Sequence, residues 1–179
     1  MSRGLGLGLA ALLLVGGLAS QQPLPSCAGP EHRQFDFWVG DWVVTDSAGS
    51  RILGTNRVTR EEAGCLIHEH WTGGPPGGGG GGGGGGGTGQ SLNFYDRATG
   101  RWAQVWVAST GNVLRLEGQL EGTAMRLEGE TRRPDGATVR NRITWTPQPD
   151  GRVRQTWQVS RDGGATWQVS FDGWYRRAG

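Results

Sequence analysis

Lysine is absent from this sequence of 179 residues, so arginine supplies all 18 of its Lys/Arg-type basic side chains. Schiff-base, pyridoxal-phosphate and Walker-A chemistry require a lysine amine that arginine cannot replace, which excludes these reactions. The arginines are dispersed along the chain and the formal net charge is only +2. Because nucleic-acid binding needs a concentrated basic face, we expect no nucleic-acid partner.

Long apolar runs are also missing, except between Leu5 and Leu18, where one follows the charge of Arg3 and ends at small residues. This arrangement is typical of a signal peptide, and the run is too short and too rich in glycine to favour spanning a membrane. We expect residues 1–20 to be removed and the protein to be exported, to the periplasm or the medium, without stable membrane insertion. An uncleaved anchor and lipidation at Cys27, in a string similar to a lipoprotein box, are the alternatives.

Cysteine is scarce, with only Cys27 and Cys65 in the chain. In an oxidising compartment an even pair of cysteines more often forms a disulfide than a metal or catalytic site. We therefore predict a Cys27–Cys65 bridge that ties an irregular N-terminal arm, residues 21–34, to a strand. With both cysteines paired and no serine in a G-x-S-x-G motif, the sequence offers no recognisable nucleophile for covalent catalysis.

Glycine, in contrast, accounts for 35 residues and forms an unbroken run from Gly77 to Gly87. Glycine loses the most entropy on ordering and has no side chain to bury. We predict a disordered glycine-rich loop at residues 73–89, inside a single domain that spans residues 35–177.

Apolar and polar residues alternate over most of this domain, and turn residues such as Asp-Gly separate the alternating segments. This pattern predicts short antiparallel strands joined by hairpins. The candidate strands are 35–45, 51–60, 65–72, 90–96, 101–109, 113–119, 123–130, 138–146, 152–160 and 166–176. Since no long crossover interrupts the hairpins, we expect an all-β, monomeric, antiparallel up-and-down barrel of about 8–10 strands, whose closure removes the sheet edges.

The string FDFWVGDW, from Phe35 to Trp42, is the most distinctive in the chain, and shorter matches follow at residues 64–66, 91–96 and 104–107. Together they resemble a family of exported bacterial calycin-like proteins of unknown function. The resemblance implies a lipocalin-like barrel and brings no established reaction. In lipocalins the Trp of a Gly-x-Trp step lies under an Arg of the last strand, so the resemblance implies that Arg176 or Arg177 packs on Trp42.

Two further resemblances bear on function. The string SRDGGATW, from Ser160 to Trp167, matches the Asp-box of sialidase-type propellers, but a single copy in a short chain predicts only a hairpin. Haem barrels of similar architecture hold iron through a histidine near the C-terminus, and this chain has no histidine after His70. We expect no cofactor.

Strand alternation assigns the inward side chains, because successive residues of a strand face opposite sides of the sheet. In three strands one face combines apolar residues with amides: Ile52, Gly54, Asn56 and Val58; Val139, Asn141, Ile143 and Trp145; and Val153, Gln155, Trp157 and Val159. Glu69 shares its face with Ile67 and Trp71. Alternation does not decide whether Trp102, Gln104 and Trp106 face inward, or Val105 and Val107.

Buried amides and carboxylates need hydrogen-bond partners, and an apolar cavity with a few convergent polar groups is the usual form of a small-molecule site. We predict a site for an unidentified small, partly apolar ligand, lined by Asn56, Glu69, Gln104, Trp106, Asn141, Trp145, Gln155 and Trp157. One alternative is an enzyme that uses Glu69 in this cavity as general acid or base. The other is an envelope protein with a packed barrel and no small ligand.

A metal site is a further possibility at His68 and His70, which lie two residues apart and project from the same side of a strand. Zinc would need a third ligand, for which His32 or Glu62 are candidates. We prefer the simpler interpretation that His68 and His70 belong to an exposed polar face, and expect no metal there.

Overall fold

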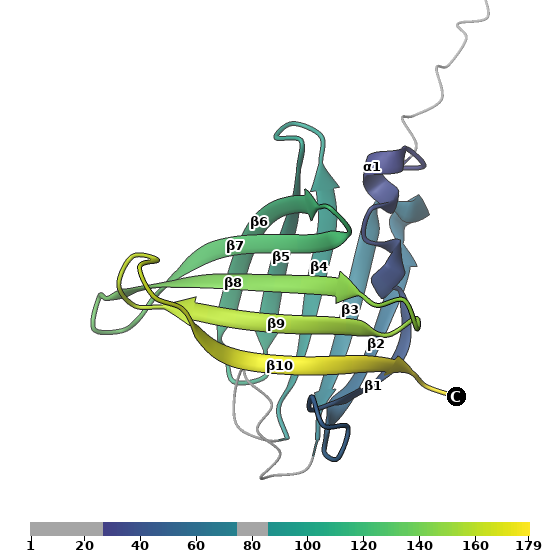
Figure 1. Cartoon of the computed structure of the whole chain (residues 1–179). Coiled ribbons are helices and arrows are strands. Elements are labelled where there is room, and N and C mark those ends of the chain that lie inside the picture. Colours follow the sequence, from purple (N-terminus) through teal and green to yellow (C-terminus); the bar gives the residue numbers. More distant parts are fainter. Residues whose placement is uncertain (1–26, 75–85) are drawn as a thin grey trace, which may run out of the picture.

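Ten antiparallel strands form a closed barrel in the computed structural model, which describes residues 27–74 and 86–179 (Figure 1). The strands are β1 (Gly40–Thr45), β2 (Ile52–Glu61), β3 (Leu66–Gly73), β4 (Thr88–Asp96), β5 (Arg101–Ala108), β6 (Val113–Glu121), β7 (Ala124–Arg132), β8 (Thr138–Pro147), β9 (Val153–Ser160) and β10 (Gln168–Arg177). Each strand pairs with the next in the chain, and β1 pairs with β10 to close the barrel. The predicted up-and-down barrel is confirmed.

Two of the sequence predictions fall on other parts of the chain. The predicted signal peptide, residues 1–20, lies outside the described residues, as do residues 75–85 of the predicted glycine loop. Within the described ranges, no helix has the length and apolar character that crossing a membrane requires.

An N-terminal cap covers one end of the barrel (Figure 1) and consists of the short helix α1 (Pro30–Arg33) and the 3-10 turn η1 (Asp36–Trp38). Phe35 and Trp38 are fully buried, and their rings stack with centroids 4.9 Å apart. The Phe35 ring also meets the rings of Trp102 and Trp145 edge-on, at 5.6 and 5.1 Å. The distinctive FDFW string is therefore a hydrophobic plug, which explains its aromatic residues without a catalytic role.

The predicted disulfide between Cys27 and Cys65 is present, and it anchors the cap to the turn η2 (Glu62–Gly64) that precedes β3. Polar contacts act beside it. Arg60 forms an ion pair with Asp36, and its Nη1 donates to the carbonyl oxygen of Gly64 at 2.7 Å. The cap is thus fixed by a covalent bond as well as by packing.

Of the two arginines predicted to pack on Trp42, the structure places Arg177 there. Its guanidinium lies 3.9 Å from the ring centroid of Trp42, and its Nη1 donates to the carbonyl oxygen of Val39 at 2.6 Å. Gly40 has a φ of +145°, and a Cβ there would lie 1.6 Å from Arg177 Nη1. The backbone conformation therefore favours glycine at this position, and a larger residue would displace the guanidinium.

The Asp-box string forms the turn between β9 and β10, as predicted. Asp162 accepts hydrogen bonds from the backbone N–H of Thr166 at 2.9 Å and from its hydroxyl at 2.6 Å. Trp167 donates to the carbonyl oxygen of Gly164 at 3.1 Å, and the Arg142 guanidinium lies 3.8 Å from its ring centroid. These contacts hold the hairpin, and they involve none of the residues of the barrel interior.

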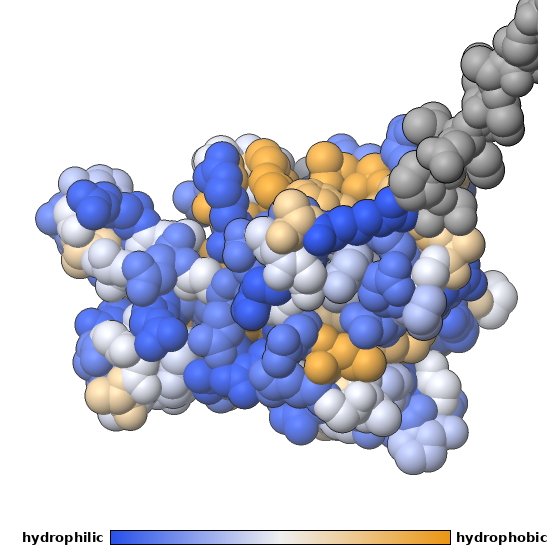
Figure 2. Space-filling model, turned by 90° about the horizontal axis from the view of Figure 1, so that it is seen from above, coloured by the Kyte–Doolittle hydropathy of each residue, from blue (hydrophilic) through white to orange (hydrophobic). Residues whose placement is uncertain are grey.

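The face of the molecule in Figure 2 is mostly hydrophilic, with hydrophobic residues gathered in patches. Alternation assigns the faces correctly in most strands, and Trp102, Gln104 and Trp106 are the inward set of β5. One assignment is wrong. Ile52 is 51% exposed and Leu53 is buried instead, because the pairing of β1 with β2 shifts register between Val44 and Thr45. Such a bulge inverts the alternation on one side of it.

Candidate functional site

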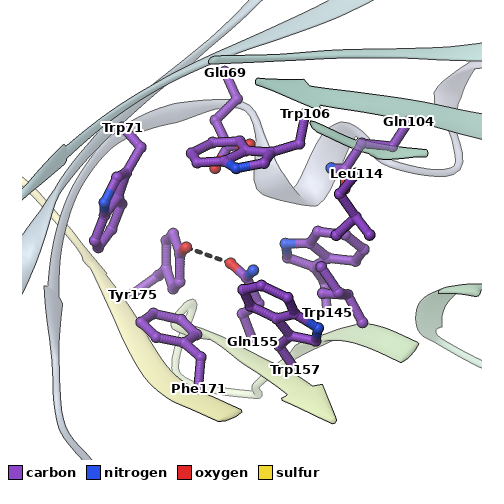
Figure 3. A pocket seen from close by; sticks show the side chains of 11 residues that line it. Glu69, Trp71, Gln104, Trp106, Leu114, Trp145, Gln155, Trp157, Phe171 and Tyr175 are labelled. Atoms are coloured by element: carbon purple, nitrogen blue, oxygen red, sulfur yellow. Dashed lines mark hydrogen bonds between the residues drawn. The ribbon is translucent and has the colours of Figure 1, made fainter. Parts of the chain in front are cut away.

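A cavity of about 50 Å³ lies inside the barrel (Figure 3). Its walls consist of Glu69, Trp71, Gln104, Trp106, Leu114, Ile143, Trp145, Gln155, Trp157, Phe171 and Tyr175. Trp71 lies near the end of β3, Trp106 near the end of β5 and Phe171 near the start of β10. In an up-and-down barrel these positions belong to the end opposite the N-terminal cap, so we call this half of the barrel the open half.

Six of the eight predicted site residues line this cavity: Glu69, Gln104, Trp106, Trp145, Gln155 and Trp157. The other two stand behind the wall. Asn56 donates to Glu69 Oε1 at 2.8 Å, and Asn141 accepts the indole N–H of Trp157 at 3.0 Å. The structure thus brings together side chains from six strands that are up to about a hundred residues apart in sequence.

Five wall residues were not in the predicted set: Trp71, Leu114, Ile143, Phe171 and Tyr175. Alternation did place Trp71 and Ile143 on the inward face of their strands. It could have identified Phe171 and Tyr175 as well, because they lie four residues apart on the inner side of β10. The outer side of β10 also carries an aromatic residue, Trp174, so aromatic character alone does not mark the inner face.

Two glycines make room for the tryptophan rings of the wall. A Cβ on Gly89 would lie 2.2 Å from Cζ2 of Trp106, and a Cβ on Gly54 would lie 2.6 Å from Cη2 of Trp71. Each ring therefore lies directly against the backbone of the neighbouring strand, where any larger residue would push it into the cavity. The space between the rings depends on these glycines.

Glu69 is the only acidic or basic side chain among the described residues of the cavity wall, and a chain of hydrogen bonds ends at its carboxyl group. Gln104 Nε2 donates to Asn93 Oδ1 at 2.7 Å, and Asn93 Nδ2 donates to Ser91 Oγ at 2.8 Å. The Ser91 hydroxyl in turn donates to Glu69 Oε2 at 2.5 Å. All donors point toward the carboxyl group, and aligned hydrogen bonds of this kind reinforce one another.

Ser91 and Asn93 belong to the hydrogen-bond chain of Glu69 but were not among the predicted site residues. They lie at alternate positions of β4 and are both buried. Their alternate spacing was a signal available in the sequence, but it competes with Leu92 and Phe94 on the other side of the same strand. In the structure Leu92 and Phe94 are exposed.

Burial raises the pKa of Glu69 to about 7, although the hydrogen bonds from Ser91 and Asn56 favour the charged form and oppose the shift. Glu69 is only 5% exposed to solvent. Glu69 therefore changes its charge near neutral pH inside a largely apolar cavity. Buried carboxyl groups with such a pKa are frequent at functional sites.

Three further polar groups face the interior near Glu69. The Tyr175 hydroxyl donates to Gln155 Oε1 (Figure 3), and burial, together with the charge of Glu69, raises the pKa of Tyr175 well above its usual range. The Trp145 indole N–H has no hydrogen-bond partner among the described residues, and its nitrogen points into the cavity in Figure 3. Trp145 is 1% exposed, so this donor is unsatisfied in an environment where that is costly.

A second cluster lies on the outer face of β3, where His68 and His70 project away from the cavity. Their third neighbour is Glu61, whose Oε2 lies 3.3 Å from His68 Nδ1, and the three possible ligand atoms are all within 4.8 Å of one another. The suggestion that His32 or Glu62 would be this neighbour is wrong. His32 is buried in the cap, where it accepts a hydrogen bond from Arg97 Nε at 3.2 Å.

The geometry of this outer cluster explains the histidines without a metal ion. His68 Nε2 is also 3.0 Å from the amide oxygen of Gln90, so both ring nitrogens of His68 already have partners. A zinc ion binds a histidine through one ring nitrogen, so binding through His68 would replace one of these two contacts. Our prediction for this cluster is an exposed polar face without a bound metal ion.

Comparison of this sequence with models of known protein families finds no match, and comparison with curated proteins finds none. Fold and site together define the class of the protein: a closed antiparallel β-barrel with a small interior cavity, lined by tryptophans and one ionisable carboxyl group.

Proposed function

We propose that this protein binds a small, partly apolar molecule in the open half of its barrel, as an exported, monomeric member of the calycin-like family that it resembles. The observation that carries the proposal is the combination of aromatic walls, the buried Glu69 and the unpartnered N–H of Trp145 around one cavity. Small-molecule sites typically join apolar walls to a few convergent polar groups of this kind.

The size of the cavity limits the ligand. In the same measure of volume one water molecule needs roughly 10–15 Å³, so a cavity of about 50 Å³ accepts roughly four water-sized groups. This is far less than the volume of a drug-sized pocket. The buried part of the ligand is therefore small, and any further part extends along the partly exposed rings of Trp71, Trp106 and Trp157 toward the open end.

Export is supported by the disulfide, since such bonds persist in oxidising compartments, and by the signal-like pattern of residues 1–20. Family membership is supported by the barrel closure and by the Trp42–Arg177 contact. Neither observation bears on the identity of the ligand.

Native mass spectrometry of the protein purified from a periplasmic extract, without a histidine tag, tests the proposal. Wild-type protein should carry a small non-covalent adduct, which Leu114→Trp should lose because Leu114 lines the cavity. Val113→Trp is the matched control, since Val113 is exposed on the outer face of the same strand. An adduct that persists in Leu114→Trp, or the absence of any adduct on wild-type protein, contradicts the proposal.

An enzyme that uses the same cavity is the second candidate, and the pKa of Glu69 near 7 favours it. A general acid or base works best when its pKa is close to the working pH. Glu69→Gln should then preserve ligand binding and abolish turnover of the bound compound. A packed barrel without a ligand is the least favoured of the three functions, because it accounts for neither the cavity nor the unsatisfied Trp145 donor.

A further inference from the structure

The charge of the cavity wall is one-sided. Its eleven residues include no arginine and no histidine, and Glu69 is the one that can carry a charge near neutral pH. Anionic ligands would meet the Glu69 carboxylate with no positive group to offset it. The chemistry of the wall therefore disfavours carboxylates and phosphates as the buried part of the ligand.

Aromatic rings form most of the remaining wall: Trp71, Trp106, Trp145, Trp157, Phe171 and Tyr175. The face of an aromatic ring carries a partial negative charge and attracts cations, most strongly in tryptophan. Figure 3 shows these rings arranged around a common space, with Glu69 at its edge. Aromatic cages of this composition bind alkylated ammonium groups in other proteins.

The ionised form of Glu69 is favoured by the charge of His68 on the outer face of β3, but no described residue supplies it with a cationic partner inside the cavity. Among the described residues none forms an ion pair with it, and its two oxygens accept hydrogen bonds from neutral groups, the Asn56 amide and the Ser91 hydroxyl. These donors hold the carboxyl group as an acceptor that faces the cavity. A buried carboxylate is stabilised most by a positive charge, and a bound cation would supply it.

We propose that the ligand of this cavity is a small organic cation, an alkylated ammonium group enclosed by the aromatic rings with Glu69 as its counter-ion. This inference rests on the proposed function and names its ligand class. A trimethylammonium group consists of about four heavy atoms, which matches the roughly four water-sized groups that the cavity accepts. The unpartnered Trp145 N–H adds the requirement for a hydrogen-bond acceptor, which a hydroxyl group on a short arm of the cation provides.

The sign of the pH dependence follows from the charge of Glu69. A cation binds to the carboxylate and not to the protonated acid, so its affinity rises with pH through about 7. The other groups that face Glu69 do not reverse this trend. Tyr175 on β10 stays neutral because its pKa is raised, Asn56 on β2 and Ser91 on β4 carry no charge, and the His68 ring lies on the outer face of β3.

Calorimetric titration of the full exported protein with two probes tests the inference. Choline carries the trimethylammonium group and a hydroxyl, and 3,3-dimethyl-1-butanol is its neutral isostere, with carbon in place of the charged nitrogen. We expect choline to bind about tenfold more tightly at pH 8 than at pH 6, because the ionised fraction of a group with a pKa of about 7 rises about tenfold between these two values. The neutral alcohol should bind at least about tenfold more weakly than choline at pH 8.

Variants locate the effect. Glu69→Gln should weaken choline binding at pH 8 by at least about tenfold and remove its pH dependence. Glu61→Gln is the matched control, because Glu61 lies on the outer face beside His68 and should leave the titration unchanged. The comparison of choline with its isostere on wild-type protein needs no substitution, so it decides the question even if Glu69→Gln does not fold.

The possible failures are distinguishable. If the neutral alcohol binds as tightly as choline, or if choline binding does not strengthen from pH 6 to pH 8, the cationic ligand is wrong and binding in the cavity stands. If neither probe binds and the native adduct is a neutral or anionic molecule, the conclusion is the same. If neither probe binds and wild-type protein carries no adduct at all, the proposed function itself fails.

Discussion

The two halves of the barrel use the same residue types for different purposes. In the capped half, Phe35 stacks on Trp38 and meets Trp102 and Trp145 with ring centroids between 4.9 and 5.6 Å apart, so aromatic rings fill the interior. In the open half the rings of Trp71, Trp106 and Trp157 line a space instead. An aromatic composition therefore indicates burial, and only the contacts between the rings distinguish a plug from a cavity.

Substitution of one tryptophan in each half tests this difference in packing and should give the largest effects on stability. Trp38→Ala removes a fully buried ring and should lower the free energy of unfolding by up to about 5 kcal/mol. Trp157→Ala removes a partly exposed ring beside a cavity and should cost less than about 2 kcal/mol. Urea denaturation measures both, and equal losses would show that the halves are packed alike.

The disulfide lies in the capped half, away from the cavity wall. Replacement of Cys27 and Cys65 by serine opens a loop of 38 residues, and the chain-entropy model assigns about 4 kcal/mol to its closure. Thermal unfolding should shift to lower temperature, while choline affinity at pH 8 stays unchanged at a temperature where the variant is folded. A parallel loss of affinity would show that the cap and the cavity are coupled.

The two halves should also titrate in opposite senses. Glu69 has a folded pKa of about 7 against 4.5 for the free side chain, so its contribution to stability is complete below pH 4.5 and is lost as the pH rises through 7. The loss amounts to about 3 kcal/mol. Wild-type protein and Glu69→Gln, compared by urea denaturation between pH 4 and pH 8, should diverge by this amount, and parallel curves would contradict the burial of an ionisable group.

His32 in the cap supplies the opposite trend. Burial lowers its pKa from 6.5, and the charge of Arg97 acts in the same direction. Since the folded state disfavours the charged ring, the contribution of His32 is present above pH 6.5 and is lost as the pH falls below that value. His32→Gln should flatten the acid side of the stability curve and leave the change near pH 7 intact.

Much of this architecture follows from the local sequence. Alternation requires only neighbouring residues, so it predicted ten strands and an inward Glu69 flanked by outward His68 and His70. It failed at Ile52, because a bulge depends on the partner strand. The identity of Arg177 follows from pairing β1 with β10, which the sequence did not specify to one residue.

The cavity, in contrast, was not predictable as an empty space. Its volume depends on Gly54 and Gly89, which lie on the strands next to Trp71 and Trp106 and let the rings lie against the backbone. The sequence shows these glycines, but their effect appears only when the register of neighbouring strands is known. For the same reason Glu61 was not recognised as the neighbour of His68.

Gly89→Ala tests the packing of the open half with a single added methyl group. Its Cβ would meet the Trp106 ring, so the ring must move into the cavity at a cost of about 2 kcal/mol. We expect the loss in the free energy of choline binding to exceed the loss in the free energy of unfolding. Thr88→Ala is the matched control, because Thr88 is exposed beside Gly89 on the same strand and does not line the cavity. Another glycine such as Gly122 would not serve, because its φ of +62° makes any substitution there strained.

The smallest effect is expected on the outer face of β3. His70→Ala removes an exposed ring and should change the free energy of unfolding by less than about 0.5 kcal/mol. Elemental analysis of the untagged protein should find no stoichiometric transition metal. A full equivalent of zinc that disappears in His70→Ala would reassign the Glu61, His68 and His70 cluster as a metal site.

The most direct test of the account is a titration of the Glu69 carboxyl carbon by NMR, in the free protein and with choline. We predict that burial sets the pKa of Glu69 at about 7 in the free protein. Bound choline should lower this pKa, because the cation stabilises the carboxylate. A carboxyl group that titrates near 4.5 and does not respond to choline would contradict both the buried carboxyl and the cationic ligand.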